Sequence, residues 1–353
     1  MIRIIFSKPI ILLLLLVQSC QIAEPSERPE FEPLNARLFK IDSAQEKGVV
    51  TSVSSVAITG VKFPFNASIL KNRKGYFLIF REIDFTSKGS YNFNKTGYVT
   101  LNDSFKVKEG PFYFNVDATL EDVRALSGPS GRVVLVGNHL AKKTSNREMV
   151  LIEAIETNKE RLQIFKIKPI NSQLDEKNWS PFFYEDELFL TYNLETTHKV
   201  ISEGLLCDPS DKCSFENKYA YQSPATTWTW GKLRGGTPAK EVMVDGRKSY
   251  LSFFHSVHRS EGLVFYFMGA LIFEGQPPFR VLKISKAPIV FDGMYRCGAV
   301  ESPILRKDWL VSYPVGLEIE GDEGVLSLGV NDSCIKIITL DLPALFNSMK
   351  YIK

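Results

Sequence analysis

Short apolar runs recur along almost the whole chain, and this pattern restricts the fold more than any other feature of the sequence. The runs are rich in β-branched and aromatic residues and are bounded by Gly, Asn, Asp or Pro, as around Gly75 to Phe80. Such runs are typical of β-strands. Helical periodicity is weak, and the one expected helix follows Asp341 as its N-cap, with Pro343 in its first turn.

The expected strands lie at residues 49–61, 75–80, 97–101, 132–136, 149–154, 162–167, 187–192, 249–255, 263–273, 309–313, 324–329 and 335–340. A chain of many short strands with almost no helix can fold as a pair of packed sheets, a barrel or a propeller. Polar clusters recur at intervals of about one four-stranded blade, which favours the propeller. In that fold, clusters far apart in sequence converge on one pocket.

Of the 353 residues, 44% are hydrophobic and 24% are charged, which is the composition of a globular protein. The net charge is +3 with both signs interspersed, so the sequence gives no electrostatic case for a nucleic-acid partner. No Cys or His spacing resembles a zinc site, and we expect no cofactor.

The N-terminus has the pattern of an export signal. Arg3 and Lys8 precede an apolar run at 9–17 that is too short to span a bilayer as a helix. The run ends at Val17-Gln18-Ser19-Cys20, which resembles a bacterial lipoprotein signal, although Gln18 departs from the usual small residue. We therefore expect a signal peptide at 1–20, lipidation of Cys20, a proline-rich tether at 21–45 and one β domain at 46–353. The alternative is a plain secretory signal.

This reading places the protein in the bacterial cell envelope, lipid-anchored to a membrane and facing the periplasm or the cell exterior. Disulfides are then expected among the remaining cysteines. Cys207 and Cys213 close a short loop, and Cys297 and Cys334 are left to pair with each other.

Two polar clusters occur in the first half of the domain. Asn66 precedes a strand that ends in Arg81, whose side chain enters a pocket or is simply solvated. In Glu121-Asp122-Val123-Arg124, two adjacent acids and an arginine can hold one carboxyl in a chosen protonation state, as a general acid requires. Asp117 competes with Asp122 for that role, and a solvated polar loop is the alternative.

Later clusters supply donors and cations. Lys177 and Asn178, with His198 after the next strand, suit sugar hydroxyls or phosphate. In Lys232-Leu233-Arg234-Gly235-Gly236-Thr237-Pro238, two glycines allow close backbone approach beside a guanidinium, and His255 ends the following strand. The alternative there is an ordinary turn. Asp332 lies in a stretch that also reads as a hairpin turn.

Taken in order, these clusters resemble the β-1,4-mannoside phosphorylase family, glycoside hydrolase family 130. The matching elements are Asn66 with Arg81, Glu121 to Arg124, Lys177 to Phe182, His198, Arg234 to Pro238, His255, Tyr266 to Ala270, Phe273 to Phe279 and Gly329 to Asp332. The family usually has proline where Val123 and Thr197 stand here.

The resemblance implies a five-bladed β-propeller with an axial active site. It also implies an inverting reaction in which Asp122 protonates the departing glycosidic oxygen by way of a sugar hydroxyl, while phosphate attacks from the opposite face. Phosphate needs cations to hold it rather than a second carboxylate. Arg81, Arg124, Arg234, His198 and His255 are the candidate cations.

The sequence therefore favours an enzyme that cleaves or transfers β-mannosides or related glycans with inversion. A cell-surface lipoprotein is an awkward place for phosphorolysis, because sugar phosphate is useful in the cytoplasm, so hydrolysis and transfer stay open. The alternative class is a non-catalytic surface lipoprotein that binds glycan, and a weaker one is an adhesion or assembly protein.

Overall fold

The computed structural model describes residues 41–353, except for 46, 84–93, 115–119, 129–130, 141–146, 158–160, 171–176, 196, 208–212, 225, 299–305 and 353. The expected signal peptide, lipidation site and most of the tether lie outside these residues, as does Asp117. Ile41 and Ala44, at the end of the expected tether, are buried in the main core, and Ala44 N donates to Val290 O at 2.7 Å.

The described chain is all-β apart from one short helix. The first sheet contains β2 (Phe65–Asn72), β3 (Gly75–Ile83), β4 (Asn94–Leu101) and β5 (Val107–Tyr113). The second contains β6 (Leu120–Ser127), β7 (Arg132–Leu140), β8 (Arg147–Glu156) and β9 (Leu162–Ile170). The third contains β10 (Ser180–Tyr184), β11 (Glu187–Asn193), β12 (Thr197–Cys207) and β13 (Cys213–Pro224). All pairings within these three sheets are antiparallel meanders.

The remaining strands form one ten-stranded sheet. One part consists of β14 (Lys232–Gly235), β15 (Lys240–Val244), β16 (Arg247–Ser260), β17 (Leu263–Glu274), β18 (Val281–Ser285) and β22 (Met349–Tyr351). The other consists of β19 (Trp309–Glu320), β20 (Glu323–Val330), β21 (Cys334–Asp341) and β1 (Val50–Val56). A short parallel pairing of β17 with β19 joins the two parts.

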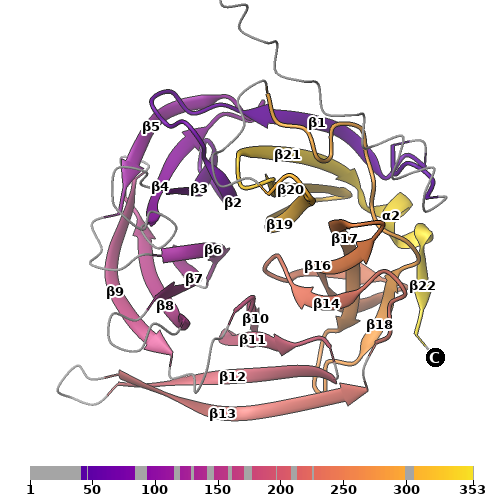
Figure 1. Ribbon diagram of the computed structural model, residues 1–353. Helices are drawn as coiled ribbons and strands as arrows, with labels where there is room; N and C mark the ends of the chain where they lie inside the picture. The colour runs from indigo at the N-terminus through magenta and orange to yellow at the C-terminus, as the bar shows by residue number, and fades with distance from the viewer. Residues whose placement is uncertain are drawn as a thin grey trace, which may run out of the picture. The chain divides into compact units, whose positions relative to one another are not determined.

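The two ends of the described chain meet in this last sheet. β1 pairs antiparallel with β21, so the first strand after the N-terminal segment completes the sheet made by β19 to β21. Within the described unit the sheets follow one another around a common centre. β2, β6, β10, β14 and β19 lie toward that centre, whereas β1 lies at the outer edge (Figure 1). This arrangement brings residues from widely separated parts of the sequence together.

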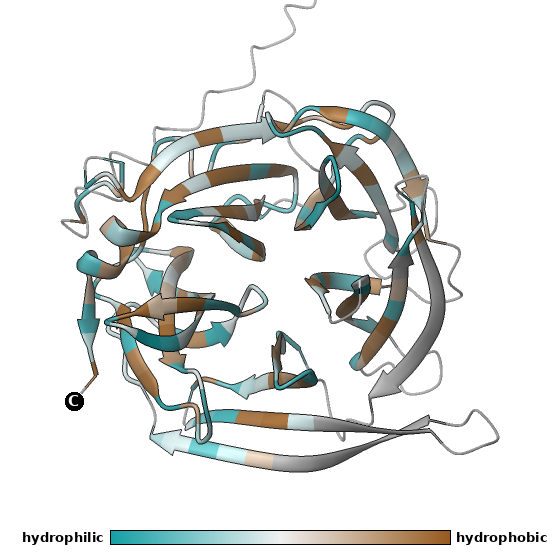
Figure 2. Cartoon of the chain, turned by 180° about the vertical axis from the view of Figure 1, so that it is seen from behind, coloured by the Kyte–Doolittle hydropathy of each residue, from teal (hydrophilic) through white to brown (hydrophobic). Residues whose placement is uncertain are grey.

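The core consists of several hydrophobic clusters between neighbouring sheets. The largest includes Phe182, Phe253, Phe273 and Phe279, all completely buried. Figure 2 shows hydrophobic residues along the coloured strands rather than gathered at one end. Burial of this apolar surface, at roughly 25 cal/mol per Å², is the main force that holds the sheets together.

Every expected strand overlaps a strand of the structure, and the predicted helix is confirmed as α2 (Leu342–Ser348). Asp341 caps it through a hydrogen bond that Ala344 N donates to Asp341 Oδ1 at 2.7 Å. The Cys297–Cys334 disulfide is also confirmed. Cys207 and Cys213 lie opposite each other in the register of β12 and β13, but their side chains lie outside what the structure describes. In the described residues, no helix is both long and apolar enough to cross a membrane.

Candidate active site

Asp122 occupies the centre of a polar cluster formed by the first strands of several sheets. It lies inside β6, at an irregularity where the register shifts between Glu121 and Arg124, and its φ is +50°. Asn66 occupies the same kind of irregularity in β2, with φ +45°. Asn178, directly before β10, has φ +64°. Asn and Asp accept this left-handed conformation at lower cost than other side chains, so the residue types match the backbone.

The Asp122 carboxylate accepts hydrogen bonds from two other strands. Asn66 Nδ2 donates to its Oδ1 at 2.8 Å, and Arg81 Nη1 on β3 donates to the same oxygen at 3.2 Å. Burial raises the pKa of Asp122, but the charge of Arg81, the Asn66 hydrogen bond and the charges of Arg124 and Lys177 outweigh it. The pKa is lowered overall, so Asp122 is ionised near neutral pH.

Glu121 and two arginines extend this cluster. Arg81 Nη2 donates to Glu121 Oε1 at 3.2 Å, and Arg147 Nε donates to Glu121 Oε2 at 3.0 Å. Glu121 and Arg81 are both buried. Arg81 therefore bridges two adjacent carboxylates, and of the two sequence readings the structure supports the one in which this arginine turns inward.

Arg124 connects four parts of the chain although only 1% of it is exposed. Its Nη1 donates to Asp122 O at 2.8 Å, and its Nη2 donates to Tyr313 Oη at 2.7 Å and to Asn178 Oδ1 at 3.4 Å. Its Nε donates to Gly236 O. Tyr313 Oη donates in turn to Asn178 Oδ1 at 2.6 Å. The guanidinium thus ties β6 to the segment before β10 and to both parts of the ten-stranded sheet.

His255 lies fully buried beside this network. Its ring stacks parallel to Tyr266, with centroids 5.7 Å apart, and contacts Tyr313 edge-on at 4.7 Å. Its Nδ1 lies 3.0 Å from Gly235 O, an arrangement in which Nδ1 carries the proton and donates. Burial, with the charges of Arg124 and Arg234, lowers the pKa of His255 to about 3. The imidazole is therefore neutral at physiological pH.

The two glycines beside Arg234 have a packing role. Lys232 to Gly235 form strand β14 against β16, with Arg234 opposite His255, rather than a turn. A Cβ at Gly235 would stand 2.0 Å from Asn178 O, and one at Gly236 would stand 2.4 Å from Phe253 O. The close approach that glycine allows here is to neighbouring backbone.

Asp332 lies in the tight turn between β20 and β21, where Asn331 and Asp332 both have φ +49°. The turn is braced by Asn331: its Nδ2 donates to Tyr295 O at 2.6 Å, and its Oδ1 accepts from Val311 N at 2.8 Å. Burial raises the pKa of Asp332 to about 6, opposed by the charge of Arg81 and reinforced by Asp122. Asp332 therefore belongs to the same electrostatic environment as Asp122.

Nine of the ten candidate site residues are linked in this way. Asn66, Arg81, Asp122, Arg124, Asn178 and His255 share contacts, while Lys177, Arg234 and Asp332 act on them through their charges. Lys177 and Arg234 are exposed. We call these nine residues, with Glu121 and Tyr313, the Asp122 cluster.

His198 lies elsewhere. It starts β12, is 2% exposed, and its Nδ1 lies 2.7 Å from Phe279 O, with its ring against Phe273. Burial lowers its pKa to about 4, partly opposed by the hydrogen bond to Phe279. These surroundings belong to the aromatic core rather than to the Asp122 cluster.

Tyr313, Glu121 and Arg147 are cluster contacts that sequence reasoning did not select. Tyr313 lies within an apolar strand run, where nothing distinguishes it from a core aromatic. Glu121 stands next to Asp122, and the motif Glu121 to Arg124 gives it no role separate from that residue. Trp179, in the Lys177 to Phe182 element, is 3% exposed and packs against Tyr192, so it is part of the core.

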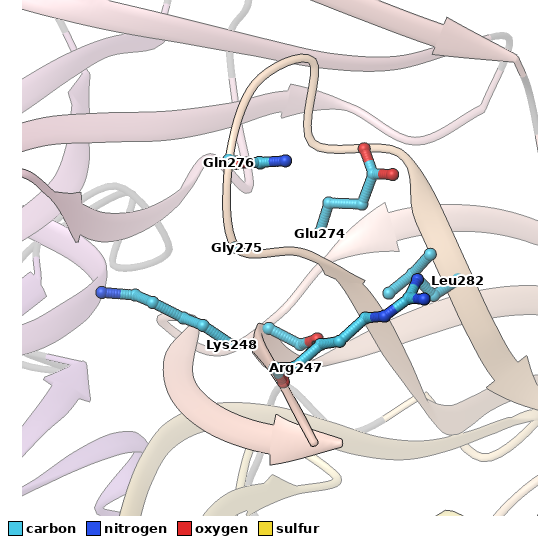
Figure 3. A pocket seen from close by; sticks show the side chains of 7 residues that line it. Arg247, Lys248, Glu274, Gly275, Gln276 and Leu282 are labelled. Atoms are coloured by element: carbon cyan, nitrogen blue, oxygen red, sulfur yellow. Dashed lines mark hydrogen bonds between the residues drawn. The ribbon is translucent and has the colours of Figure 1, made fainter. Parts of the chain in front are cut away.

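A separate pocket lies at the β15–β16 hairpin and the segment after β17 (Figure 3). Its volume is about 370 Å³, and its lining includes Arg247, Lys248, Glu274 and Gln276. It contains no residue of the Asp122 cluster. Glu274 pairs with Arg280 at 2.8 Å, so its carboxylate already has a cationic partner. Among the described residues, no group of three His, Cys, Asp or Glu side chains could hold a metal ion.

The fold and the site define an all-β protein with a buried, charge-rich cluster between its sheets. No family model matches the chain, and no curated protein matches it. Solved structures of the GH130 family do match in fold. One of them is described among GH130 glycoside hydrolases that target β-1,2-mannosidic linkages in Candida mannan. It is 13% identical to this chain, and the match covers 79% of this chain and 84% of that chain with a TM-score of 0.55.

Two further structures have phosphorylase names. A β-1,2-mannobiose phosphorylase from Listeria innocua is 14% identical over 86% of this chain and 97% of its own, with TM-score 0.55. A mannose phosphorylase from Leishmania mexicana is 14% identical, and the match covers 92% of this chain and 97% of that chain with a TM-score of 0.53. At this identity the likeness establishes the fold, which this chain has in common with structures of mannoside-active enzymes.

Proposed function

We propose that this protein is a carbohydrate-active enzyme that cleaves or transfers β-mannosides or related glycans with inversion, with Asp122 as its general acid. The fold is then a five-bladed β-propeller, whose blades are the three four-stranded sheets and the two parts of the ten-stranded one. The observation that carries the proposal is the Asp122 cluster, in which one largely buried carboxyl is held by two donors from the neighbouring sheet, Asn66 on β2 and Arg81 on β3. A shared fold with mannoside-active enzymes supports the choice of substrate class.

The ionised state of Asp122 constrains this mechanism. A general acid must carry a proton when the glycosidic bond breaks. Because the pKa of Asp122 is lowered in the free protein, the carboxyl has to take up a proton when substrate binds. A bound sugar excludes water and brings hydroxyl groups against the carboxyl, and both effects favour the protonated form. Substrate binding should therefore be coupled to proton uptake.

The test is incubation of purified protein with manno-oligosaccharides, with and without inorganic phosphate, beside an Asp122→Asn variant. We expect release of free sugar or sugar phosphate with inversion, and loss of activity in the variant by about 10²-fold or more. Isothermal titration in two buffers of different ionisation enthalpy measures the proton uptake. The absence of product in every condition would reject the enzyme.

A non-catalytic, glycan-binding surface lipoprotein is the second candidate. The lowered pKa of Asp122 favours it, because an ionised carboxylate accepts hydrogen bonds from sugar hydroxyls without delivering a proton. In that case the protein is anchored at Cys20 in the cell envelope and binds oligosaccharide, but the parent shows no turnover. Glycan affinity unchanged by Asp122→Asn, together with an inactive parent, distinguishes this function from the enzyme.

A further inference from the structure

The arginine at the heart of the Asp122 cluster uses four of its five N–H groups on protein atoms. Arg124 donates to Gly236 O, Asp122 O, Tyr313 Oη and Asn178 Oδ1, and is 1% exposed. With one N–H left and the side chain almost completely buried, a phosphate held by the usual pair of parallel hydrogen bonds would have to displace bonds that hold separate sheets together. Losing a hydrogen bond of a buried charged group is strongly unfavourable. Arg124 is therefore a structural cation, unsuited to holding a nucleophile that enters and leaves.

Arg81 is committed in the same way. Its two terminal nitrogens face Asp122 and Glu121, each at 3.2 Å, and its side chain is 7% exposed. An anion brought to this guanidinium would stand beside two carboxylates, where like charges repel strongly because the site is shielded from water. Arg81 stabilises the acids of the site and leaves no vacant cationic face for phosphate.

The histidines add no charge. His255 has a pKa of about 3 and uses Nδ1 on Gly235 O, and His198 lies in the aromatic core away from the cluster. Lys177, Arg234 and Arg306 remain as cations near the site, and all three are exposed. Exposed charges act on an anion through water and salt, which weakens them greatly. Among the described residues, the cluster therefore has no desolvated set of cations of the kind that holds a phosphate nucleophile.

Asp332 is held differently from Asp122. Among the described residues no hydrogen-bond donor to its carboxylate is present, whereas Asn331 on its N-terminal side is fixed by bonds to Tyr295 and Val311. The Cys297–Cys334 disulfide braces the same turn two residues further on. The backbone is rigid there, while the carboxylate keeps its acceptor capacity for another molecule.

The turn also lies next to the site. A Cβ at Gly329, just before the turn, would stand 1.9 Å from Asn66 Oδ1, so the end of β20 packs directly on the residue that donates to Asp122. The charged groups that act on Asp332 are Arg81, Asp122, Glu121 and Arg306. The turn that carries Asp332 therefore lies beside Asn66, and the Asp332 carboxyl is near enough to Asp122 for their charges to interact.

We propose that the acceptor of this site is water, activated by Asp332 as general base, and that inorganic phosphate is not a substrate. This inference rests on the proposed function and specifies its reaction as inverting hydrolysis. The glycosidic C1–O bond breaks as the leaving oxygen receives the proton of Asp122, directly or through a sugar hydroxyl. The water oxygen bonds to C1 from the opposite face, and its proton passes to Asp332. Solvent exchange then restores both carboxyl groups.

The experiment follows β-linked mannobiose with the purified full chain in H₂¹⁸O, with and without millimolar phosphate. We expect free mannose with one ¹⁸O at the new anomeric hydroxyl, a rate independent of phosphate and no sugar phosphate by ³¹P NMR. Asp332→Asn, which tolerates the same backbone conformation, should lower kcat by about 10²–10⁴-fold. Azide should restore turnover as inverted glycosyl azide, because it needs no base. A purely structural defect would show no such rescue.

Asp186→Asn is the matched control, since Asp186 also has positive φ in a tight turn but is exposed in the β10–β11 hairpin. It should retain the parent rate. Formation of sugar 1-phosphate, or saturable phosphate binding by calorimetry, overturns the acceptor while leaving the proposed enzyme intact. Full hydrolytic activity in Asp332→Asn overturns the base. No turnover of any mannoside rejects the proposed function itself, and the inference with it.

Discussion

Asn66 on β2 donates a hydrogen bond to Asp122 on β6 across the boundary between two sheets, at 2.8 Å. Each residue sits at a bulge of the first strand of its sheet and has a left-handed backbone, which turns its short polar side chain out of the regular alternation of the strand. Asn178, directly before β10, also has a left-handed backbone. The candidate site is therefore built from a recurring irregularity in the innermost strands.

The first prediction concerns the Asn66 hydrogen bond. Asn66→Gly keeps the left-handed backbone but removes the donor, so the pKa of Asp122 should rise from its lowered value. The ¹³C shift of the Asp122 carboxyl, followed through a pH titration, measures this change. Asn102→Gly, in the exposed β4–β5 turn, is the control and should leave that pKa where it is. An unchanged pKa in Asn66→Gly would show that the charges of Arg81, Arg124 and Lys177 set the ionisation without the Asn66 hydrogen bond.

The second prediction concerns Arg124 as a link between sheets. Arg124→Lys keeps the charge but cannot reach four acceptors in different directions. We expect the free energy of unfolding to fall by about 3 kcal/mol or more. Urea denaturation measures it, with Arg247→Lys at an exposed position expected to stay within about 0.5 kcal/mol of the parent. A loss as small as the control's would mean that the network is not structural.

The third prediction concerns acid stability. His198 and His255 have folded pKa values of about 4 and about 3, below the ordinary value of 6.5. The unfolded chain binds these protons first, so stability is lost as the pH falls from about 6.5 toward 4. Asp332, whose pKa is raised to about 6, acts in the opposite direction between its ordinary value of 3.8 and 6.

Because these contributions oppose one another, the prediction is tested as a difference between variants. The free energies of unfolding of the parent and of a His198→Gln, His255→Gln double variant are compared at pH 7 and pH 5. The parent should lose more stability on acidification than the variant. An equal loss in both would mean that the two imidazoles already take up protons in the folded state.

The fourth prediction concerns the disulfide. Cys297 and Cys334 are separated by 37 residues, and chain-entropy arguments give a bridge of that length about 4 kcal/mol of stability. Replacing both cysteines by alanine should lower the urea midpoint accordingly. If the turn at Asp332 depends on this brace, the double variant should also lose affinity for glycan. Unchanged binding would show that Asn331 is sufficient to hold the turn.

The strands that flank the site were the hardest to predict. Long apolar runs such as Leu263 to Phe273 were found because burial enforces their composition. In β6 the bulge at Asp122 interrupts the alternation, so Glu121 and Asp122 read as a polar loop although they lie within a strand. β12 and β13 form a long hairpin in a region where the sequence predicts no strand.

Residue chemistry predicted the site better than contacts. Asn66, Arg81 and Asp122 are predicted from polar clusters whose order along the chain resembles the GH130 family, and their side chains do lie together. His198 is predicted on the same ground, but its ring packs against Phe273, and a lone histidine gives no sign of which sheet boundary it enters. Tyr313 could not be found at all, because its role depends on the position of Arg124 in a distant strand.

The pairing of β1 with β21 has a consequence for how the chain reaches its native state. During synthesis, β1 has no partner strand in this sheet until β21 has been made, more than 270 residues later. Long-range closure of this kind slows folding and exposes an aggregation-prone edge in the meantime. A polypeptide that ends before β21 therefore leaves β1 unpaired, because β21 is the strand that connects β1 to the rest of the sheet.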